Sequence, residues 1–164
     1  NLNSNFYLKN YYTKVFEKVF INDLKYSSIP RIENIGFVSK FNLLLKNVST
    51  ESDNYKEYTN KFRSQNYGSI LYDVLYPLKK EGNTFDNFLT GKASFMYSPN
   101  KNKNVKNLDR IIDINNIYSQ NRLGLDDSVE GGQSITLGGE YKITDKENNS
   151  ILTAGLASLS LIHI

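Results

Sequence analysis

The sequence contains no cysteine and no tryptophan, one histidine, one methionine and three prolines. Without cysteine the chain cannot form a disulfide scaffold, a thiolate zinc site or a cysteine nucleophile. The single histidine, His163, stands next to the end of the chain, which excludes most histidine-based catalysis and metal binding. No apolar run approaches the roughly 18 residues that a membrane-spanning helix needs. The sequence therefore excludes a helical membrane protein, and we expect no enzyme and no cofactor.

The charge of the chain is nearly balanced. The formal net charge is +3, and lysine, aspartate and glutamate are interspersed along the sequence. Nucleic-acid binding needs a clustered basic stripe, which is absent, so we expect no nucleic-acid partner. Aromatic residues make up 13% of the sequence, which is too many for a disordered tail. The length of 164 residues is typical of a single domain.

The dominant pattern in the sequence is the alternation of apolar and polar residues. A β-strand places successive side chains on opposite faces, so alternation marks strands with one apolar and one polar side. Such stretches occur around residues 37–45, 70–76, 85–97 and 135–143. Turn-forming residues separate them near residues 52–54, 81–83, 98–104 and 146–150. The fold class is therefore predicted to be all-β, as an antiparallel meander.

Two architectures share this pattern. An outer-membrane barrel and a soluble β-sandwich both have one apolar and one polar face on each strand. Several stretches reach the length of about 9–11 residues that a tilted membrane-spanning strand needs. Tyrosines also gather towards the ends of stretches, as aromatic girdles do, at Tyr7, Tyr11, Tyr12, Tyr55, Tyr58 and Tyr76. Alternation alone leaves both architectures open.

One segment, residues 107–132, does not alternate. It contains two of the four arginines, Arg110 and Arg122, among glycines and asparagines. Beside them stand the carboxylates of Asp109, Asp113, Asp126, Asp127 and Glu130. An arginine beside carboxylates can form bidentate pairs that fix a loop or a strand end. A solvated loop with weak surface ion pairs is the plainer interpretation.

Residues 116–132 (NIYSQNRLGLDDSVEGG) also resemble the C-terminal barrel of the LptD family of lipopolysaccharide-assembly proteins. Members carry an Asn-(Ile/Phe)-(Phe/Tyr)-Ser-x-Asn-Arg element, an acidic pair, and Glu-Gly before a strand. Shorter similarities occur at residues 29–32 (IPRI), 76–78 (YPL) and 93–104 (ASFMYSPNKNKN). The resemblance implies an arc of a large transmembrane β-barrel in the outer membrane of a Gram-negative bacterium.

The resemblance also implies function and partners. The family inserts lipopolysaccharide into the outer leaflet without covalent chemistry. Its members receive lipopolysaccharide from a periplasmic bridge protein, and a lipoprotein plugs the lumen. The residues that match the family motif, and that we expect to face the lumen, are Asn116, Asn121, Arg122, Asp126, Asp127, Glu130, Gly131 and Gly132. There we expect Arg122 to pair with Asp126, Asp127 or Glu130, and Arg110 with Asp109 or Asp113.

On this interpretation residues 1–164 are part of a single barrel domain and a segment of a longer protein. At about 3.3 Å per residue the length suffices for roughly seven or eight strands. Residues 159–164 (LSLIHI) break the preceding pattern, so we interpret residues 158–164 as a tail outside the native domain. The family's interdomain cysteines are absent, and Ile164 is not the aromatic residue that commonly ends such barrels. The alternatives are another outer-membrane barrel, such as a porin or receptor, and a soluble glycan-binding β-sandwich.

Overall fold

The computed structural model describes residues 1–11, 15–54, 59–102 and 111–162. All regular secondary structure in these residues is β-strand, as the alternation predicted. The strands are β1 (Leu2–Tyr11), β2 (Val15–Ser27), β3 (Arg31–Ile32), β4 (Val38–Asp53), β5 (Arg63–Glu81), β6 (Phe85–Ser98), β7 (Gly132–Asp145) and β8 (Ser150–Ile162). The four alternating stretches of the sequence correspond to β4, β5, β6 and β7.

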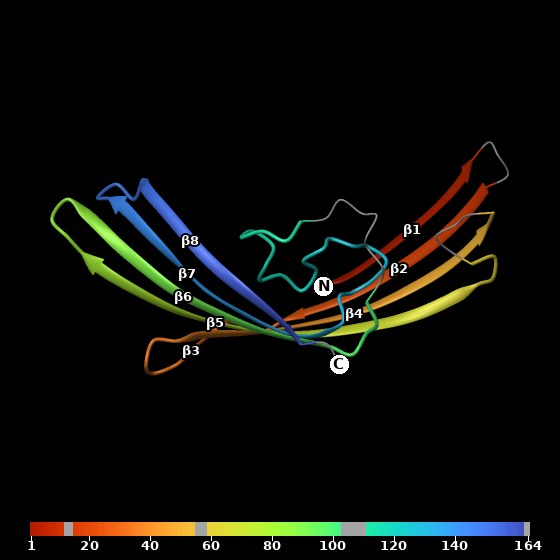
Figure 1. Cartoon of the computed structure of the whole chain (residues 1–164), viewed down its shortest axis with the longest axis horizontal. Helices are drawn as coiled ribbons and strands as arrows, with labels where there is room; N and C mark the ends of the chain where they lie inside the picture. Colours follow the sequence, from red (N-terminus) through yellow and green to blue (C-terminus); the bar gives the residue numbers. More distant parts are fainter. Residues whose placement is uncertain (12–14, 55–58, 103–110, 163–164) are drawn as a thin grey trace.

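The strands form one antiparallel sheet in which neighbours in sequence are neighbours in space. The order is β1-β2-β4-β5-β6-β7-β8, with the short β3 paired to β4. β1 and β8 are the outer strands, and the sheet curves into a trough (Figure 1). The described part of β8 includes Leu159, which pairs with Thr136 of β7, and Leu161, which pairs with Ser134. Residues 158–162, which the sequence analysis places in a tail outside the native domain, thus pair with β7 as the last part of β8, because backbone pairing continues where side-chain alternation stops.

The two faces of the curved sheet differ in chemistry. The convex face carries exposed and half-exposed apolar side chains over its central part, with no second sheet among the described residues to cover them. We call this surface the apolar belt. Cross-strand register assigns to it Leu24, Tyr26, Phe41, Leu43, Leu45, Ile70, Tyr72, Val74, Tyr76, Leu78, Leu89, Ala93, Phe95, Tyr97, Ile135, Leu137, Tyr141, Ile143, Leu152, Ala154 and Leu156.

The concave face is mostly polar, and part of it is buried. A small apolar cluster of Val19, Ile21 and Val48 lies there, with Tyr7 and Tyr67 packed against it.

Tyr7 was predicted to belong to an outward aromatic girdle, and that is wrong, because its register opposite Val19 places it on the concave face. Of the other tyrosines in that prediction, Tyr76 lies on the convex face 4.6 Å from Phe37, measured between ring centroids. Tyr12, Tyr55 and Tyr58 lie outside the described residues.

The described part of the chain contains no helix that is long and apolar enough to span a membrane.

Candidate functional site on the concave face

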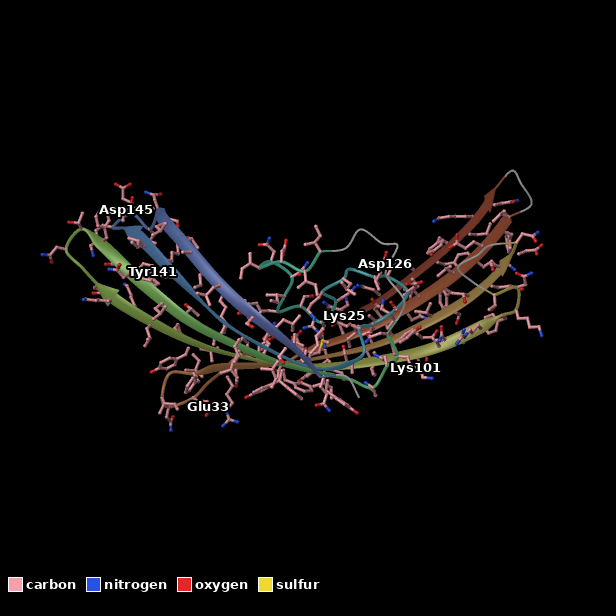
Figure 2. The ribbon with its side chains drawn as sticks, in the orientation of Figure 1. Lys25, Glu33, Lys101, Asp126, Tyr141 and Asp145 are labelled. Atoms are coloured by element: carbon pink, nitrogen blue, oxygen red, sulfur yellow. The ribbon has the colours of Figure 1, made fainter. Side chains whose placement is uncertain are left out.

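The connection from β6 to β7 folds back over the trough. Its described part nearest β7, residues 111–131, is here called the concave-face loop. Figure 1 shows it lying over the middle of the sheet, and Figure 2 shows Asp126 on this loop above the strands. Two apolar side chains of the loop are buried, Leu125 with 7% and Val129 with 1% of their surface exposed. Their burial makes the loop part of the packed structure.

Arg122 is the central polar contact of the loop. Its guanidinium makes two hydrogen bonds to Glu130, from Nε at 2.9 Å and from Nη2 at 2.8 Å. Nη2 also donates to Ser134 Oγ of β7 at 3.0 Å and lies 3.9 Å from Met96 Sδ of β6. Only 3% of Arg122 is exposed. Of the three carboxylates considered from the sequence, Glu130 is the partner, and the pair joins the loop to two strands. The pairing expected for Arg110 lies outside the described residues, because Arg110 itself does.

Two further contacts hold the loop to β4 and β5. Lys46 Nζ of β4 donates to the Asp126 carbonyl oxygen at 2.7 Å and forms an ion pair with Asp23 at 2.8 Å. Gln120 Nε2 lies 3.2 Å from the Ser69 carbonyl oxygen and 3.3 Å from the Asn42 carbonyl oxygen. Together with Arg122, these side chains connect the loop to β4, β5, β6 and β7. The loop therefore braces four strands at once.

The two asparagines of the motif shape the loop from within. Asn121 makes reciprocal bonds with the backbone of Leu125: its Nδ2 donates to the carbonyl oxygen at 2.9 Å, and its Oδ1 accepts from the amide at 3.1 Å. Asn116 Nδ2 donates to the Ile111 carbonyl oxygen at 2.8 Å, and its Oδ1 accepts from the Asp113 amide at 2.9 Å. Both residues close local turns, since their amides substitute for backbone partners.

The remaining motif residues divide between surface and close packing. The Asp126 side chain is exposed, and only its carbonyl oxygen joins the site, whereas Asp127 lines a neighbouring pocket. Gly131 is buried, and a Cβ there would overlap the carbonyl oxygen of Asn100. Gly132 has a φ of 100° at the start of β7, a conformation that favours glycine. The two glycines thus allow the chain to pass close to Asn100 and to turn into β7.

Tyr118 makes a second close approach between loop and sheet. A Cβ on Gly138 of β7 would overlap both the Tyr118 hydroxyl and the Leu156 carbonyl oxygen. The hydroxyl is buried and has no hydrogen-bond partner among the described residues. Burial raises the pKa of the Tyr118 phenol, and the nearby Lys92 ammonium acts in the opposite direction. A cavity of about 330 Å³ between Tyr118, Lys92 and Leu75 adjoins this contact.

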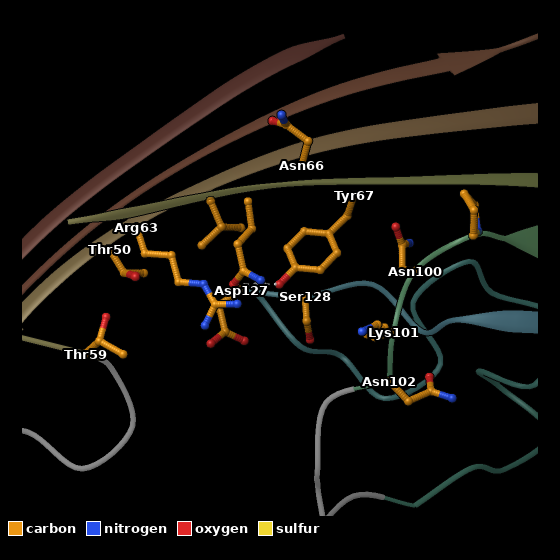
Figure 3. A pocket seen from close by; sticks show the side chains of 13 residues that line it. Thr50, Thr59, Arg63, Asn66, Tyr67, Asn100, Lys101, Asn102, Asp127 and Ser128 are labelled. Carbon is orange, nitrogen blue, oxygen red and sulfur yellow. Dashed lines mark hydrogen bonds between the residues drawn. The ribbon is translucent and has the colours of Figure 1, made fainter. Parts of the chain in front are cut away.

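A larger hollow of about 460 Å³ lies beside the loop, between β4, β5 and residues 99–102. Figure 3 shows Arg63, Tyr67 and Ser128 directed into it, whereas Asn66 points to the opposite face of the sheet. Its lining is rich in hydroxyl and amide groups, and Lys101 and Arg63 add positive charge. The Ser128 hydroxyl is buried without a hydrogen-bond partner among the described residues. Such a lining suits a ligand with many hydrogen-bonding groups.

Sequence reasoning missed several of these residues. Lys46, Gln120 and Tyr118 carry the contacts between loop and sheet, but none of them belongs to the charge cluster that drew attention to the segment. Alternation did place Lys46 on the polar side of its strand. Nothing in the sequence indicates that a loop some 80 residues further on lies above it.

The site has the character of a structural anchor, because its charged groups are paired with one another and with the backbone. Among residues 1–11, 15–54, 59–102 and 111–162, no group of three histidine, cysteine, aspartate or glutamate residues could hold a metal ion. No model of a protein family matches the chain. No curated protein matches it either.

Proposed function

We propose that the chain is an arc of a large outer-membrane β-barrel that takes part in lipopolysaccharide assembly. The observation that carries the membrane part is the inverted distribution of side chains. Leu137 and Phe95 on the convex face are 57% and 41% exposed, while the charged Lys46 and Arg122 on the concave side are 5% and 3% exposed. Transmembrane barrels combine an apolar outer surface with a polar interior in this way.

The size of the barrel follows from the loop. An eight-stranded barrel has an interior just wide enough for its own side chains. Here the concave-face loop packs over β4, β5, β6 and β7 through Gln120, Lys46 and Arg122. A wider barrel is needed to accommodate such a loop, so the outer strands β1 and β8 pair with further strands in the complete assembly.

The lipopolysaccharide part rests on the resemblance of residues 116–132 to the LptD family. In this proposal Arg122 and Glu130 fix the loop inside the lumen, and transport proceeds without catalysis or a cofactor. The partners are lipopolysaccharide, a lipoprotein plug and a periplasmic bridge protein. The hollow beside Arg63 and Ser128 offers hydrogen-bonding groups of the kind that saccharides use. The location is the outer membrane of a Gram-negative bacterium.

The alternatives fit less of the structure. A porin or receptor barrel has the same apolar belt but gives no reason for the motif around Arg122. A soluble glycan-binding sandwich requires a second sheet over Phe41, Leu43, Phe95 and Ile135. Among the described residues, none packs a second sheet there, and Phe95 and Ile135 are 41% and 40% exposed. The single curved sheet favours the barrel.

The experiment has two arms. The full protein is expressed with a signal peptide, and its membranes are fractionated and extracted with detergent. We expect recovery in the outer membrane, and a monomer soluble without detergent would contradict the barrel. In the second arm, lipopolysaccharide at the cell surface is measured for Arg122→Ala and for the matched control Arg31→Ala, whose side chain is 79% exposed. Loss of export in Arg122→Ala alone supports the proposal, whereas normal export in a membrane-inserted variant would remove the role assigned to the loop.

A further inference from the structure

A row of amides and hydroxyls crosses the convex face at one border of the apolar belt. Ser4, Asn22, Asn47 and Asn66 stand opposite one another on β1, β2, β4 and β5. Ser4 Oγ donates to Asn22 Oδ1 at 2.7 Å, and Asn47 Nδ2 donates to Asn66 Oδ1 at 2.7 Å and to Ser64 Oγ at 3.1 Å. We call these four residues the amide row. It is uncharged, laterally bonded and open to the surroundings of the sheet.

The distance between the amide row and the opposite border of the apolar belt fits the thickness of a membrane. Along β5 the belt runs from Gly68, next to the amide row, to Leu78, and Lys80 follows on the same face. That stretch is about 33 Å long at roughly 3.3 Å per residue, or about 23 Å high at a tilt of about 45°. The apolar band of outer-membrane barrels is about 25 Å tall. At the second border the Tyr141 hydroxyl donates to Asn87 Oδ1 at 2.6 Å.

The two ends of the sheet are not alike. Beyond the amide row β4 continues to Asp53 and β5 begins at Arg63, and the pair Lys18–Glu51 stands there at 3.1 Å. The strand ends that flank 54–62 and 99–131 lie at this end, whereas those that flank 28–37, 82–84 and 146–149 lie at the other. The difference in length comes from the 33 residues between β6 and β7, because 28–37 is about as long as 54–62. At that other end β5 stops at Glu81, close to the border of the belt. Outer-membrane barrels have longer loops outside the cell and short turns on the periplasmic side.

We infer that the amide row contacts the headgroup layer of the external leaflet, and that the end carrying connections 54–62 and 99–131 faces the outside of the cell. This inference rests on the proposed membrane location. Amides that face hydrocarbon lack partners for their remaining donors and acceptors, which is costly. At the headgroup level they meet phosphate and hydroxyl oxygens. Beyond the row on the same face stand first Phe6 and Phe20 on β1 and β2 and then the pair Lys18–Glu51. Aromatic side chains followed by charged ones are the order found where outer-membrane barrels cross the headgroup layer.

Labelling of single cysteines tests the orientation, because the chain has no cysteine of its own. Asp53→Cys marks the end beyond the amide row, Asn83→Cys marks the opposite turn, and Leu137→Cys marks the middle of the belt. A membrane-impermeant maleimide is applied to intact cells that produce the full protein. We expect Asp53→Cys to react, Asn83→Cys to react only after permeabilisation, and Leu137→Cys to react only in detergent.

The outcomes separate this inference from the proposed function. If Leu137→Cys reacts as readily as the two marker positions in intact membranes, the membrane location itself fails. If Leu137→Cys is protected and only the order of the two marker positions is reversed, the orientation fails and the barrel stands.

Contact with headgroups is measured separately. Asn47→Cys and Leu137→Cys carry a bimane fluorophore in the full protein, reconstituted into phosphatidylethanolamine–phosphatidylglycerol vesicles. We expect lipids spin-labelled at the headgroup to quench the fluorophore at position 47 more strongly, and lipids brominated on the acyl chains to quench the one at 137. Quenching at 47 by the brominated chains, or by neither lipid because a second copy covers the row, overturns the contact.

Discussion

Leu71 and Tyr72 are neighbours on β5 but lie in opposite surroundings. Leu71 is 6% exposed on the concave side, in register with Met96, whereas Tyr72 is 44% exposed on the convex side, in register with Phe95. The same contrast runs along the sheet, with polar burial on one side and apolar exposure on the other. A water-soluble protein gains stability by removing apolar surface from water, and the convex face leaves that surface free. The two faces therefore differ in which side chains they bury, and under the proposed function the convex face meets lipid.

We expect the largest loss of stability when the Arg122–Glu130 pair on the concave side is removed. Arg122→Ala leaves Glu130, whose side chain is 10% exposed, without its partner, and breaking a pair that is buried in this way costs about 3–5 kcal/mol. We expect the concave-face loop to detach, so that limited proteolysis cuts within residues 111–131. The double variant Arg122→Met/Glu130→Leu leaves no unpaired charge and is expected to restore most of the protection. Equal resistance of wild type and Arg122→Ala would refute the anchoring role.

Next in size is a charge placed on the convex side. Leu137→Arg puts a guanidinium in the middle of the apolar belt, where arginine on the lipid face of a barrel costs about 2–4 kcal/mol. The matched control is Thr90→Arg on the concave side, where we expect little change. Denaturant unfolding from lipid vesicles measures both free energies. Equal destabilisation by the two arginines would mean that the faces do not differ in solvent.

Two adjacent glycines, Gly138 and Gly139, allow the concave and convex faces to be compared by adding one methyl group to each. Gly138 faces the Tyr118 hydroxyl and the Leu156 carbonyl oxygen, and Gly138→Ala is expected to cost about 1–3 kcal/mol by overpacking. A Cβ on Gly139, which points to the convex side, meets only the Thr90 carbonyl oxygen at 3.5 Å. Gly139→Ala should therefore stay within about 0.5 kcal/mol of wild type. Tyr118→Phe should relieve part of the cost at Gly138, and thermal unfolding of the three variants checks this.

The smallest effect is expected outside the belt. Lys18 and Glu51 pair at 3.1 Å on the convex side, with 44% and 43% of their side chains exposed. Such a pair contributes about 0.2–1 kcal/mol and is screened by salt. Lys18→Met should shift the unfolding midpoint slightly at low ionic strength and not at high ionic strength. A large shift that does not depend on salt would place this pair inside the belt.

Much of the fold follows from alternation. A strand fixes which side chains share a face, so the sequence alone is enough to assign Phe41, Ile70, Phe95 and Ile135 to apolar strand faces. The end of β8 could not be assigned in this way, because Leu159 and Leu161 put apolar side chains on the face that is polar elsewhere. Backbone hydrogen bonding holds such residues in a strand regardless of their side chains.

The site was less predictable than the fold. The cluster around Arg122 was visible because charge and glycine gather in sequence, and its partner was among three possible carboxylates. The sequence contains no information that selects Glu130 over Asp126, since the choice depends on how the loop turns above β7. Tyr7 was misplaced for a related reason: a tyrosine near a strand end belongs to a girdle only if its register turns it outward.

The contacts of the concave-face loop also predict the sequence in which parts of the chain fold. Successive strands pair with their neighbours, so the sheet can grow through closures of short range. The loop differs, because Lys46 and the Asp126 carbonyl oxygen are 80 residues apart, and Gln120 is 78 residues from its partner Asn42. Contacts of such separation form late, after the loop-closure entropy has been met by other pairings. The partners of the loop are distributed over β4, β5, β6 and β7. We therefore expect the loop to dock only after these four strands have reached their correct register, because in a misregistered sheet its hydrogen-bond partners are displaced.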